Sequence, residues 1–291
     1  MFHGRTIYIK RDDLVDPDLS GNKFRKLFFL LNTPSENYKR IISYGGSQSN
    51  AMASIAALCK RKGWTFLYIT KTLSKTLKDA LQGNLASALS DGMQLLEVEH
   101  AAYENVIRSL YTPTPDSRIA SYEGDLLLAQ GGADLGAKAG IKVLAQEIQQ
   151  WREEQHIQKL TVITPSGTGT TALYLAKYME ETKVMTTALV GSKAYLQEQM
   201  SSLESIPDNL NILETSKKYH FAKPYKEYVE IYEMMKEQEI EIDLLYAPKM
   251  LLALGEKMSE IEGDILYVHS GGTKGNTSML GRYKRKGFFT P

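Results

Sequence analysis

Two long stretches of the chain contain no charged residue, and both have the same internal order. They run from Ile41 to Cys59 and from Leu160 to Ala176. Each opens with an apolar run that includes β-branched residues, continues through small polar residues and glycines, and ends in an alanine-rich segment. The polar middle makes either stretch a poor bilayer span. The order is that of a strand, a loop and a helix, which is the repeating unit of a parallel α/β sheet.

The same alternation of short apolar runs and longer periodic segments continues along the chain. Further strands are predicted at Thr65–Ile69, Met93–Val98, Leu126–Ala129, Thr186–Val190 and Ile265–His269. Helical patterns separate them at Leu77–Ser90, Gly136–Glu154, Ala194–Leu203 and Tyr225–Gln238. Repeated alternation of this kind indicates α/β architecture with parallel sheets flanked by helices, in which ligands bind at the carboxyl ends of the strands.

Composition and charge narrow the class of protein. A chain of 291 residues corresponds to about two domains, at roughly 150 residues each. Its 35 Lys and Arg against 34 Asp and Glu leave a formal charge of +1, which argues against a protein dedicated to nucleic acid or a membrane surface. A single cysteine, Cys59, and the lack of a charged-then-apolar leader predict a reducing, cytoplasmic location. The histidines lack metal-ligand spacing, so no metal site is predicted.

Three bends rich in glycine and hydroxyl side chains follow predicted strands, at 45–50, 164–171 and 270–273. Such a bend before a helix presents free backbone N–H groups at the positive end of the helix dipole, where phosphate or carboxylate binds. Any one of them could be only a tight connection in which glycine supplies a positive φ. Three in one chain favour a ligand that carries a phosphate. His269, beside the last bend, is the histidine placed closest to this chemistry.

A cluster of cations opens another predicted helix. Lys23, Arg25 and Lys26 occupy its start, with Ser20 or Asn22 as the cap. The helix dipole disfavours positive charge there by about 0.3–1 kcal/mol for each cation, so either these side chains point to water or an anion lies nearby. Crowding by the two neighbouring cations would lower the pKa of the Lys23 amine, as Schiff-base chemistry requires. Pyridoxal phosphate combines an aldehyde for such an amine with a phosphate for the bends.

Short motifs are spread over nearly the whole chain. They are Lys10-Arg11-Asp12-Asp13-Leu14, Gly21-Asn22-Lys23 with Arg25-Lys26-Leu27, Gln48-Ser49-Asn50, Gly83-Asn84-Leu85, Gly131-Gly132 with Gly136 and Gly140, Ser166-Gly167-Thr168-Gly169, Asp243-Leu244-Leu245-Tyr246 and Ser270-Gly271-Gly272. Together and in this order, they resemble the 1-aminocyclopropane-1-carboxylate deaminase/D-cysteine desulfhydrase family. The resemblance implies a two-domain, tryptophan synthase β-like fold of PLP fold type II, with pyridoxal 5'-phosphate as the cofactor.

The resemblance also implies which residues contact the cofactor. Lys23 would form the Schiff base with its aldehyde, Asn50 would bond to its phenolic oxygen, and Ser270 would meet the pyridine nitrogen. The phosphate would be held by a loop of Ser166, Gly167, Thr168, Gly169 and Thr170. By the same resemblance a large domain comprises 1–33 and 134–291, a small domain comprises 34–133, and two copies form a homodimer.

On the substrate side, the resemblance implies that Lys23 moves the α-proton and that Tyr246 faces the substrate. Ser49 would hold the substrate carboxylate or take part in acid/base work. Two positions depart from the family pattern, since Ala51 stands where histidine is usual and Ala247 stands where deaminases have glutamate and desulfhydrases usually have threonine. The family's second active-site tyrosine has several candidates here: Tyr219, His220, Phe221 and Tyr225.

The alanine at position 247 bears on the activity. A carboxylate beside the pyridine nitrogen keeps the ring protonated and makes it a strong electron sink, which neither Ala247 nor the Ser270 hydroxyl does. A weaker sink suits removal of the α-proton with loss of a good leaving group better than it suits the opening of a cyclopropane. We therefore expect α,β-elimination from a small, D-cysteine-like amino acid, giving ammonia and a 2-oxo acid. Deamination of 1-aminocyclopropane-1-carboxylate is the alternative.

Two other interpretations differ in class. Ala51 and Ala247 are compatible with a protein that binds PLP and catalyses little. Alternatively, the bends belong to a sugar-phosphate or nucleotide enzyme in which Lys23 lies at the surface. The basic segment Arg282–Lys286 is interpreted as a solvated face, with nucleic-acid binding as a remote option.

Overall fold

The computed structural model describes residues 2–19, 21–113, 117–120 and 122–288. Within these ranges the strands form two sheets in which all paired strands are parallel. The strands are β1 (Tyr8–Arg11), β2 (Arg40–Tyr44), β3 (Thr65–Lys71), β4 (Gln94–Val98), β5 (Asp125–Leu127), β6 (Leu160–Ile163), β7 (Lys183–Thr187), β8 (Leu210–Leu213) and β9 (Asp264–His269). The five-stranded sheet has the order β1-β9-β6-β7-β8, and the four-stranded sheet has the order β4-β3-β2-β5.

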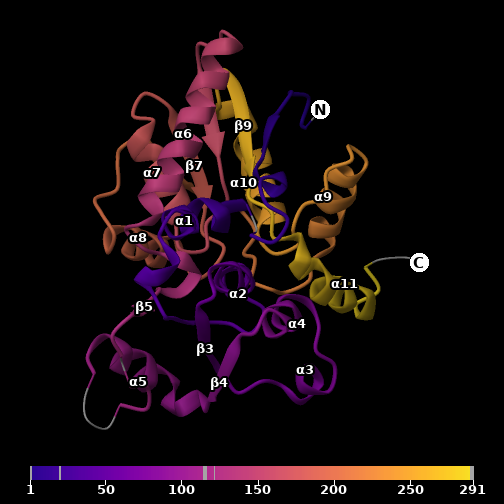
Figure 1. Ribbon diagram of the computed structural model, residues 1–291. Helices are drawn as coiled ribbons and strands as arrows, with labels where there is room; N and C mark the ends of the chain where they lie inside the picture. Colours follow the sequence, from indigo (N-terminus) through magenta and orange to yellow (C-terminus); the bar gives the residue numbers. More distant parts are fainter. Residues whose placement is uncertain (1, 20, 114–116, 121, 289–291) are drawn as a thin grey trace.

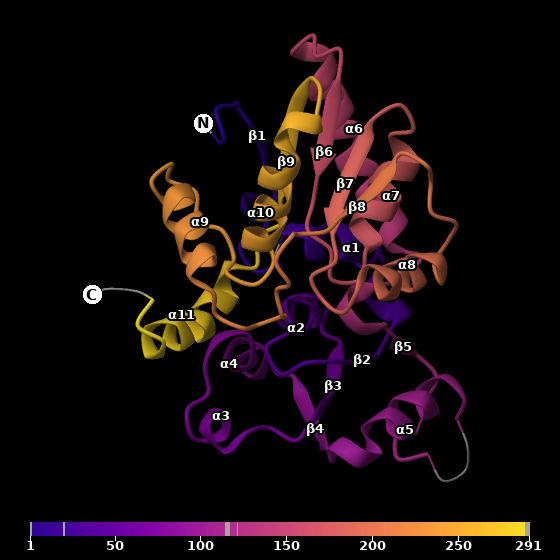
Figure 2. The same cartoon turned by 180° about the vertical axis from the view of Figure 1, so that it is seen from behind.

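Helices cover both sheets, as Figures 1 and 2 show from opposite sides. They are α1 (Gly21–Leu31), α2 (Asn50–Lys62), α3 (Lys75–Asp79), α4 (Gly83–Ser90), α5 (His100–Tyr111), α6 (Ala137–Glu154), α7 (Thr170–Tyr178), α8 (Lys193–Ser201), α9 (Lys226–Lys236), α10 (Ala247–Lys257) and α11 (Asn276–Arg285). In both views the four-stranded sheet lies below the five-stranded one, and α1 and α2 lie between them.

The five-stranded sheet is buried on both faces because successive residues of its strands point to opposite sides. Val162 of β6 packs into a core shared with α6 and α7, whereas Ile163 packs into a core shared with α9, α10 and α11. On β9, Leu266 and Tyr267 divide in the same way between the two cores. This double burial explains why the strands are short apolar runs without a polar face.

The four-stranded sheet has the same layered construction. Ile41 of β2 packs with α2 and α4 on one face, and its neighbour Ile42 packs with α5 on the other. The strands of this sheet lie between residues 40 and 127, whereas the five-stranded sheet takes β1 from before that segment and its other strands from after it. The crossovers and parallel pairing confirm the α/β class.

The contact between α1 and α6 joins the N-terminal segment to the five-stranded sheet. A Cβ added at Gly140 of α6 would lie 2.0 Å from the Arg25 backbone oxygen, so only glycine permits this approach of the two helices. Arg25 also donates to Asp12 at 2.8 and 2.9 Å and to Glu147 of α6 at 2.7 and 2.8 Å. These bonds fix α1, and with it Lys23, against the sheet.

Most predicted elements are confirmed, with three corrections. The helix expected over Leu77–Ser90 is two helices, α3 and α4, because the chain breaks before Gly83, whose φ is +61°. The strand expected at Thr186–Val190 begins earlier, as β7, because its register is set by pairing with β6. Asn22 lies inside α1 and does not cap it, and Ser20 falls outside the described residues.

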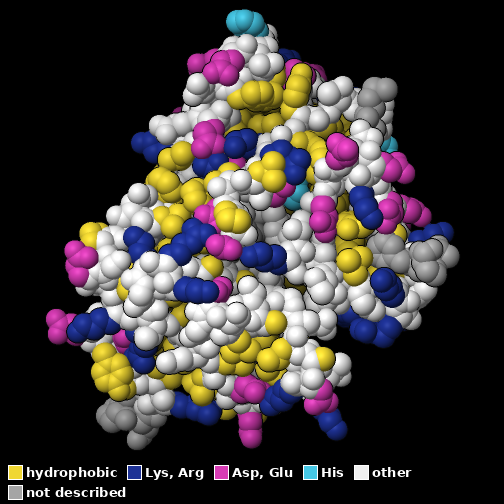
Figure 3. Space-filling view, turned by 45° about the vertical axis from the view of Figure 1, so that its right-hand side comes forward, with side chains coloured by type: hydrophobic (Ala, Val, Ile, Leu, Met, Phe, Trp, Pro, Cys, Tyr) yellow, Lys and Arg dark blue, Asp and Glu magenta, His cyan; other side chains and the backbone are white. Residues whose placement is uncertain are grey.

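Some elements were not predicted from the sequence. They are β8, α5, α10 and α11. Among the described residues, no helix is long and apolar enough to cross a membrane. On the face shown in Figure 3, basic and acidic side chains are intermingled, in keeping with a formal charge of +1.

Candidate active site

A cavity of about 410 Å³ lies at the carboxyl ends of strands from both sheets. Its walls include the loops that follow β2, β6 and β9, which is where α/β sheets bind ligands. Residues that the resemblance assigned to cofactor and substrate all line it: Lys23, Ser49, Asn50, Ser166, Gly167, Thr168, Gly169, Thr170, Tyr246 and Ser270. Tertiary folding thus brings together residues separated by more than two hundred positions.

Lys23 reaches the cavity because α1 begins directly against the end of β9. A Cβ at Gly21 would lie 2.7 Å from the Asp12 backbone oxygen and 2.8 Å from that of Ser270, so glycine is needed at this contact. The Asn22 N–H donates to the Ser270 carbonyl oxygen at 3.2 Å. Lys23, the next residue, lines the cavity.

Burial lowers the pKa of the Lys23 amine to about 8, and the nearby Asp243 carboxylate opposes this shift. The cause predicted from sequence, crowding by Arg25 and Lys26, is therefore wrong in its main part. The Arg25 guanidinium is bound to Asp12 and Glu147. Lys26 is 4% exposed, and burial together with the Lys23 charge lowers its own pKa well below the ordinary value. Desolvation of the amine is what suits Lys23 to carbonyl chemistry.

Lys26 is a site residue whose role sequence reasoning missed. Its Nζ donates to Thr168 Oγ1 and to the Gly131 backbone oxygen, each at 3.2 Å. Thr168 Oγ1 in turn lies 3.0 Å from Thr170 Oγ1. A buried amine beside two hydroxyl groups is suited to holding a phosphate. Its spacing from Lys23, one helical turn along α1, was the available signal.

The loop after β6 has the geometry of an anion site. Gly169, with φ of +79°, precedes α7, and a Cβ there would lie 2.5 Å from the Met200 Cε atom. The Ser166 hydroxyl accepts a hydrogen bond from Thr186 Oγ1 at 2.6 Å, which fixes its rotamer. Thr170 and Thr171, at the start of α7, line the cavity, so the positive end of the helix dipole favours an anion there.

Asn50 is oriented by a second asparagine from the adjacent helix. Asn84 Nδ2 donates to Asn50 Oδ1 at 2.6 Å and to the Gln48 backbone oxygen at 3.0 Å, while the Asn84 N–H donates to Gln48 Oε1 at 3.0 Å. Since Asn50 Oδ1 accepts this bond, its Nδ2 group is left as the donor toward the cavity. Asn84 is a positioning residue, and the break between α3 and α4 places it here.

Ser49 and Tyr246 lie at other parts of the cavity wall. The Ser49 hydroxyl caps α2 by accepting the Met52 N–H at 3.3 Å. Burial raises the pKa of the Tyr246 phenol well above its usual value, so it stays protonated at neutral pH. Four residues are candidates for the position of the family's second active-site tyrosine. Of these, Phe221 alone is on the described cavity wall, and the centre of its ring lies 5.6 Å from that of Tyr246.

Asp243 and His269 support this wall from behind. Asp243 Oδ1 accepts the N–H groups of Leu245 and Tyr246 at 2.9 and 2.6 Å, which shapes the turn into α10. His269 is fully buried; its Nδ1 accepts the Gly271 N–H at 3.3 Å, and its Nε2 lies 2.9 Å from the Glu241 backbone oxygen. It therefore holds the bend after β9 rather than facing the cavity.

The basic segment at the end of α11 is only partly a solvated face. Its four cations, Arg282, Lys284, Arg285 and Lys286, are exposed, whereas Tyr283 is fully buried; Arg282 also lines the cavity. The expectation is wrong for Tyr283 alone, because the helix turns this side chain into the core, whereas Arg282 is exposed at the edge of the site.

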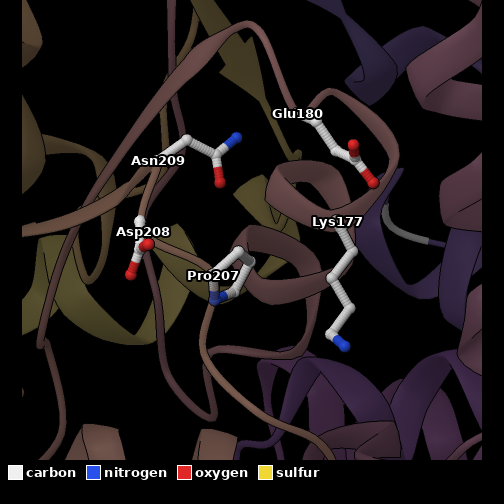
Figure 4. A pocket seen from close by; sticks show the side chains of 5 residues that line it. All are labelled: Lys177, Glu180, Pro207, Asp208 and Asn209. Carbon is white, nitrogen blue, oxygen red and sulfur yellow. The ribbon is translucent and has the colours of Figure 1, made fainter.

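A second pocket, shown in Figure 4, lies between the end of α7 and the start of β8. Asn209 Nδ2 donates there to the backbone oxygens of Ala176, Met179 and Thr182, and Lys177 pairs with Glu204. These bonds tie loops together and leave little for a ligand. Across the described part of the chain, no group of three or more His, Cys, Asp or Glu side chains could hold a metal ion.

The cavity fits pyridoxal phosphate on its own chemistry. It has a buried amine of lowered pKa for the aldehyde and, in the same space, a loop of hydroxyls and N–H groups with a second lysine for the phosphate. Its volume lies within the roughly 300–1,000 Å³ of small-molecule sites.

Comparisons with known proteins agree with this fit. The model of the pyridoxal-phosphate dependent enzyme family matches residues 2–271. A putative 1-aminocyclopropane-1-carboxylate deaminase of Thermotoga maritima is 27% identical over 94% of this chain and 90% of its own. A D-cysteine desulfhydrase of Serratia proteamaculans is 25% identical over 92% and 87%. A solved structure of an ACC deaminase homologue has the same fold, with a TM-score of 0.73 at 19% identity over 96% of this chain and 89% of that one.

Proposed function

The chain belongs to the pyridoxal-phosphate-dependent enzyme family, and from this premise we propose that it catalyses α,β-elimination on a small amino acid. The products are ammonia and a 2-oxo acid. The observation that carries the proposal is the Lys23 amine, with its pKa lowered to about 8, in one cavity with the loop that precedes α7. The relatives named D-cysteine desulfhydrase support a sulfur-containing substrate of this kind.

Different residues of the cavity would bind the cofactor and the substrate. Thr168, Thr170 and Lys26 hold the cofactor phosphate, and Asn50 Nδ2 donates to the phenolic oxygen. The Ser49 loop, at the start of α2, holds the substrate carboxylate with N–H groups at the positive end of the helix. Tyr246 donates its phenolic hydrogen to the substrate, since its raised pKa keeps that hydrogen in place.

Lys23 moves the proton. When bound, pyridoxal phosphate withdraws electrons from the α-carbon of the amino acid. Lys23 Nζ takes the proton from that carbon, the bond from Cβ to the leaving group breaks, and the electron pair of that bond departs with a thiolate. The freed enamine takes up water and yields ammonia and the 2-oxo acid.

The surroundings of the pyridine nitrogen favour a good leaving group. Ala247 is fully buried among apolar side chains, and no Asp or Glu lines the part of the cavity that the structure describes. The nitrogen, which we assign to Ser270, therefore has no carboxylate to keep it protonated. An elimination that expels thiolate tolerates this weaker electron sink.

A substrate panel tests the reaction. Purified holoenzyme is incubated with D-cysteine, L-cysteine, D-serine, cysteate and 1-aminocyclopropane-1-carboxylate, and ammonia and 2-oxo acid are measured. We expect release from an amino acid with a β-leaving group, and its loss in Lys23→Ala. Release from the cyclopropane compound alone would establish the second candidate, which the relative named as a putative deaminase favours. A cofactor spectrum without turnover of any amino acid would indicate a PLP-binding protein.

Assembly and location are part of the same proposal. We expect a homodimer in the cytoplasm with no nucleic-acid or membrane partner. We also propose the division into a large domain of 1–33 with 134–291 and a small domain of 34–133, which the assignment of the strands to two sheets supports. Light scattering should give twice 32.7 kDa, and a mass of 32.7 kDa at micromolar concentration would contradict the dimer.

A further inference from the structure

The cationic side chains on the cavity wall differ in whether a hydrogen-bond acceptor or a proposed reaction step accounts for them. Lys23, Lys26 and Arg282 line the described cavity, and no carboxylate side chain does. Lys23 serves the chemistry, and Lys26 is bound to Thr168 and Gly131 at the phosphate end. Arg282 remains as a positive charge that neither the cofactor nor the proposed reaction uses.

Arg282 is presented by a helix that is itself well anchored. On α11, Ser278, Met279 and Arg282 share the face toward the cavity, since residues three and four apart lie on one side of a helix. Met279 is 3% exposed and Tyr283 is fully buried, so packing fixes the helix on both sides of position 282 in the sequence.

The Arg282 guanidinium lacks a strong acceptor within the described residues. Its one hydrogen bond there runs from Nη1 to the Met279 sulfur at 3.7 Å, and sulfur is a weak acceptor. No Asp or Glu of the described chain pairs with it. A guanidinium presents parallel N–H donors that match the two oxygens of a carboxylate, sulfonate or phosphate.

The position of Arg282 along α11 separates it from Asn50, which follows Ser49 of the loop proposed to hold the α-carboxylate. A Cβ at Gly275, just before α11, would lie 3.7 Å from Asn50 Oδ1. Arg282 lies seven residues further, about 10 Å along the helix axis. Arg282 is exposed and also lines the cavity, so its side chain lies at the solvent-facing edge of the cavity wall.

We propose that Arg282 forms a subsite for a second acidic group, so that the preferred amino acid has a sulfonate, phosphate or carboxylate on its side chain. This rests on the proposed function for the α-amino and α-carboxylate ends. Where the acidic group is a leaving group on Cβ, Lys23 Nζ takes the α-proton, the bond from Cβ breaks, and the electron pair leaves with sulfite or phosphate.

Binding to the holoenzyme tests the subsite independently of turnover. Dissociation constants are measured from the visible absorbance change on adding each enantiomer of cysteate, O-phosphoserine, aspartate, serine and alanine. Arg282→Gln should weaken the binding of the acidic amino acids by roughly tenfold more than it weakens the binding of serine. This factor corresponds to the loss of one charge-assisted hydrogen bond. Arg282→Lys should restore part of the difference. Arg285→Gln, the same charge change one turn on and outside the cavity wall, is the matched control.

The outcomes separate this subsite from the proposed reaction. Equal weakening of acidic and neutral amino acids would assign Arg282 to the α-carboxylate and overturn the subsite. Equal affinity of the wild-type protein for both kinds would also overturn it. Discrimination by Arg282 without any release of ammonia would support the subsite and contradict the elimination. Failure of every amino acid to bind would overturn both.

Discussion

At the scale of single residues, two lysines on adjacent turns of α1, the half-buried Lys23 and the buried Lys26, have different surroundings. Lys23 faces the cavity with an amine whose pKa is lowered to about 8, because burial penalises its charged form. Lys26 is turned to Gly131 and Thr168. The intervening Arg25 is tied to carboxylates and takes no part. A run of three cations in sequence thus becomes an amine of lowered pKa on the cavity wall, a second amine bound to the loop before α7, and one structural ion pair.

The lowered pKa of Lys23 makes its reactivity depend on pH near neutrality. The neutral amine is the nucleophile, and the charged form loses its proton as the pH rises through about 8, so the neutral fraction grows from about one in a hundred at pH 6 to about half at pH 8. An amine-reactive reagent should therefore label Lys23 in the cofactor-free protein at a rate that rises in the same way with pH. Mass spectrometry follows the labelling. A midpoint near 10.5, the ordinary value, would contradict the burial of this amine.

The second lysine is predicted to serve cofactor retention. Lys26→Met removes a charge-assisted hydrogen bond to the phosphate and should weaken cofactor binding by roughly 10- to 100-fold, while Lys23 still gives the spectrum of the bound cofactor. Equilibrium dialysis against pyridoxal phosphate measures this. Lys142→Met, an exposed lysine on α6, is the control. Equal retention by both variants would remove Lys26 from the phosphate site.

At the scale of elements, the approach of α1 to α6 positions the site. Gly21 and Gly140 permit contacts with the backbone that any side chain would block. Both glycines belong to motifs that the sequence analysis identified without a structural reason for the glycine. Gly140 is therefore explained by helix packing and Gly21 by its contact with the backbone of Asp12 and Ser270. Gly169 is explained by a positive φ and by Met200.

Gly140→Ala tests this packing. The added Cβ would lie 2.0 Å from the Arg25 backbone oxygen, so α1 must shift, at a cost of about 1–3 kcal/mol. We expect a lower midpoint of thermal unfolding together with weaker cofactor binding, because Lys23 moves with α1. The control is Gly281→Ala on α11, where the Cβ meets only Arg285 Nη1 at 3.7 Å and should leave stability unchanged or slightly higher. Equal midpoints for the two variants would argue against a tight α1–α6 contact.

At the scale of the whole molecule, the cavity is built from both sheets. The loops after β2, β6 and β9 all line it, so a ligand there would contact residues carried by both sheets. Parallel sheets with their carboxyl ends facing a common space explain how residues as distant as Lys23 and Ser270 lie on one wall.

Cofactor binding should therefore stabilise the molecule as a unit. Pyridoxal phosphate at about a hundred times its dissociation constant should add about 2.7 kcal/mol to the free energy of unfolding of the cofactor-free protein and raise its melting midpoint. Pyridoxal, which lacks the phosphate, should raise it less at the same concentration. Scanning calorimetry checks both, and an equal effect of the two compounds would show that the phosphate loop contributes nothing.

Local pattern was enough to predict the strand-loop-helix units around the two uncharged stretches, because burial on both faces requires apolar strands and small residues at the bends. The motifs in order predicted the family and its cofactor. Local pattern failed for α11, whose charged segment gains stability only from burying Met279 and Tyr283 against distant elements. It also failed at the break between α3 and α4, where Gln48 bonds to the chain around Asn84.

The amino-acid order by itself thus determined the α/β class, the family and a set of candidate site residues that line one cavity, since these depend on side-chain type and short spacing. Only the tertiary structure decided why Lys23 has a low pKa, that Lys26 turns to the phosphate loop, that Asn84 orients Asn50 and that Arg282 reaches the cavity. Burial and hydrogen-bond direction depend on neighbours brought from far along the chain. No local window of sequence contains those neighbours.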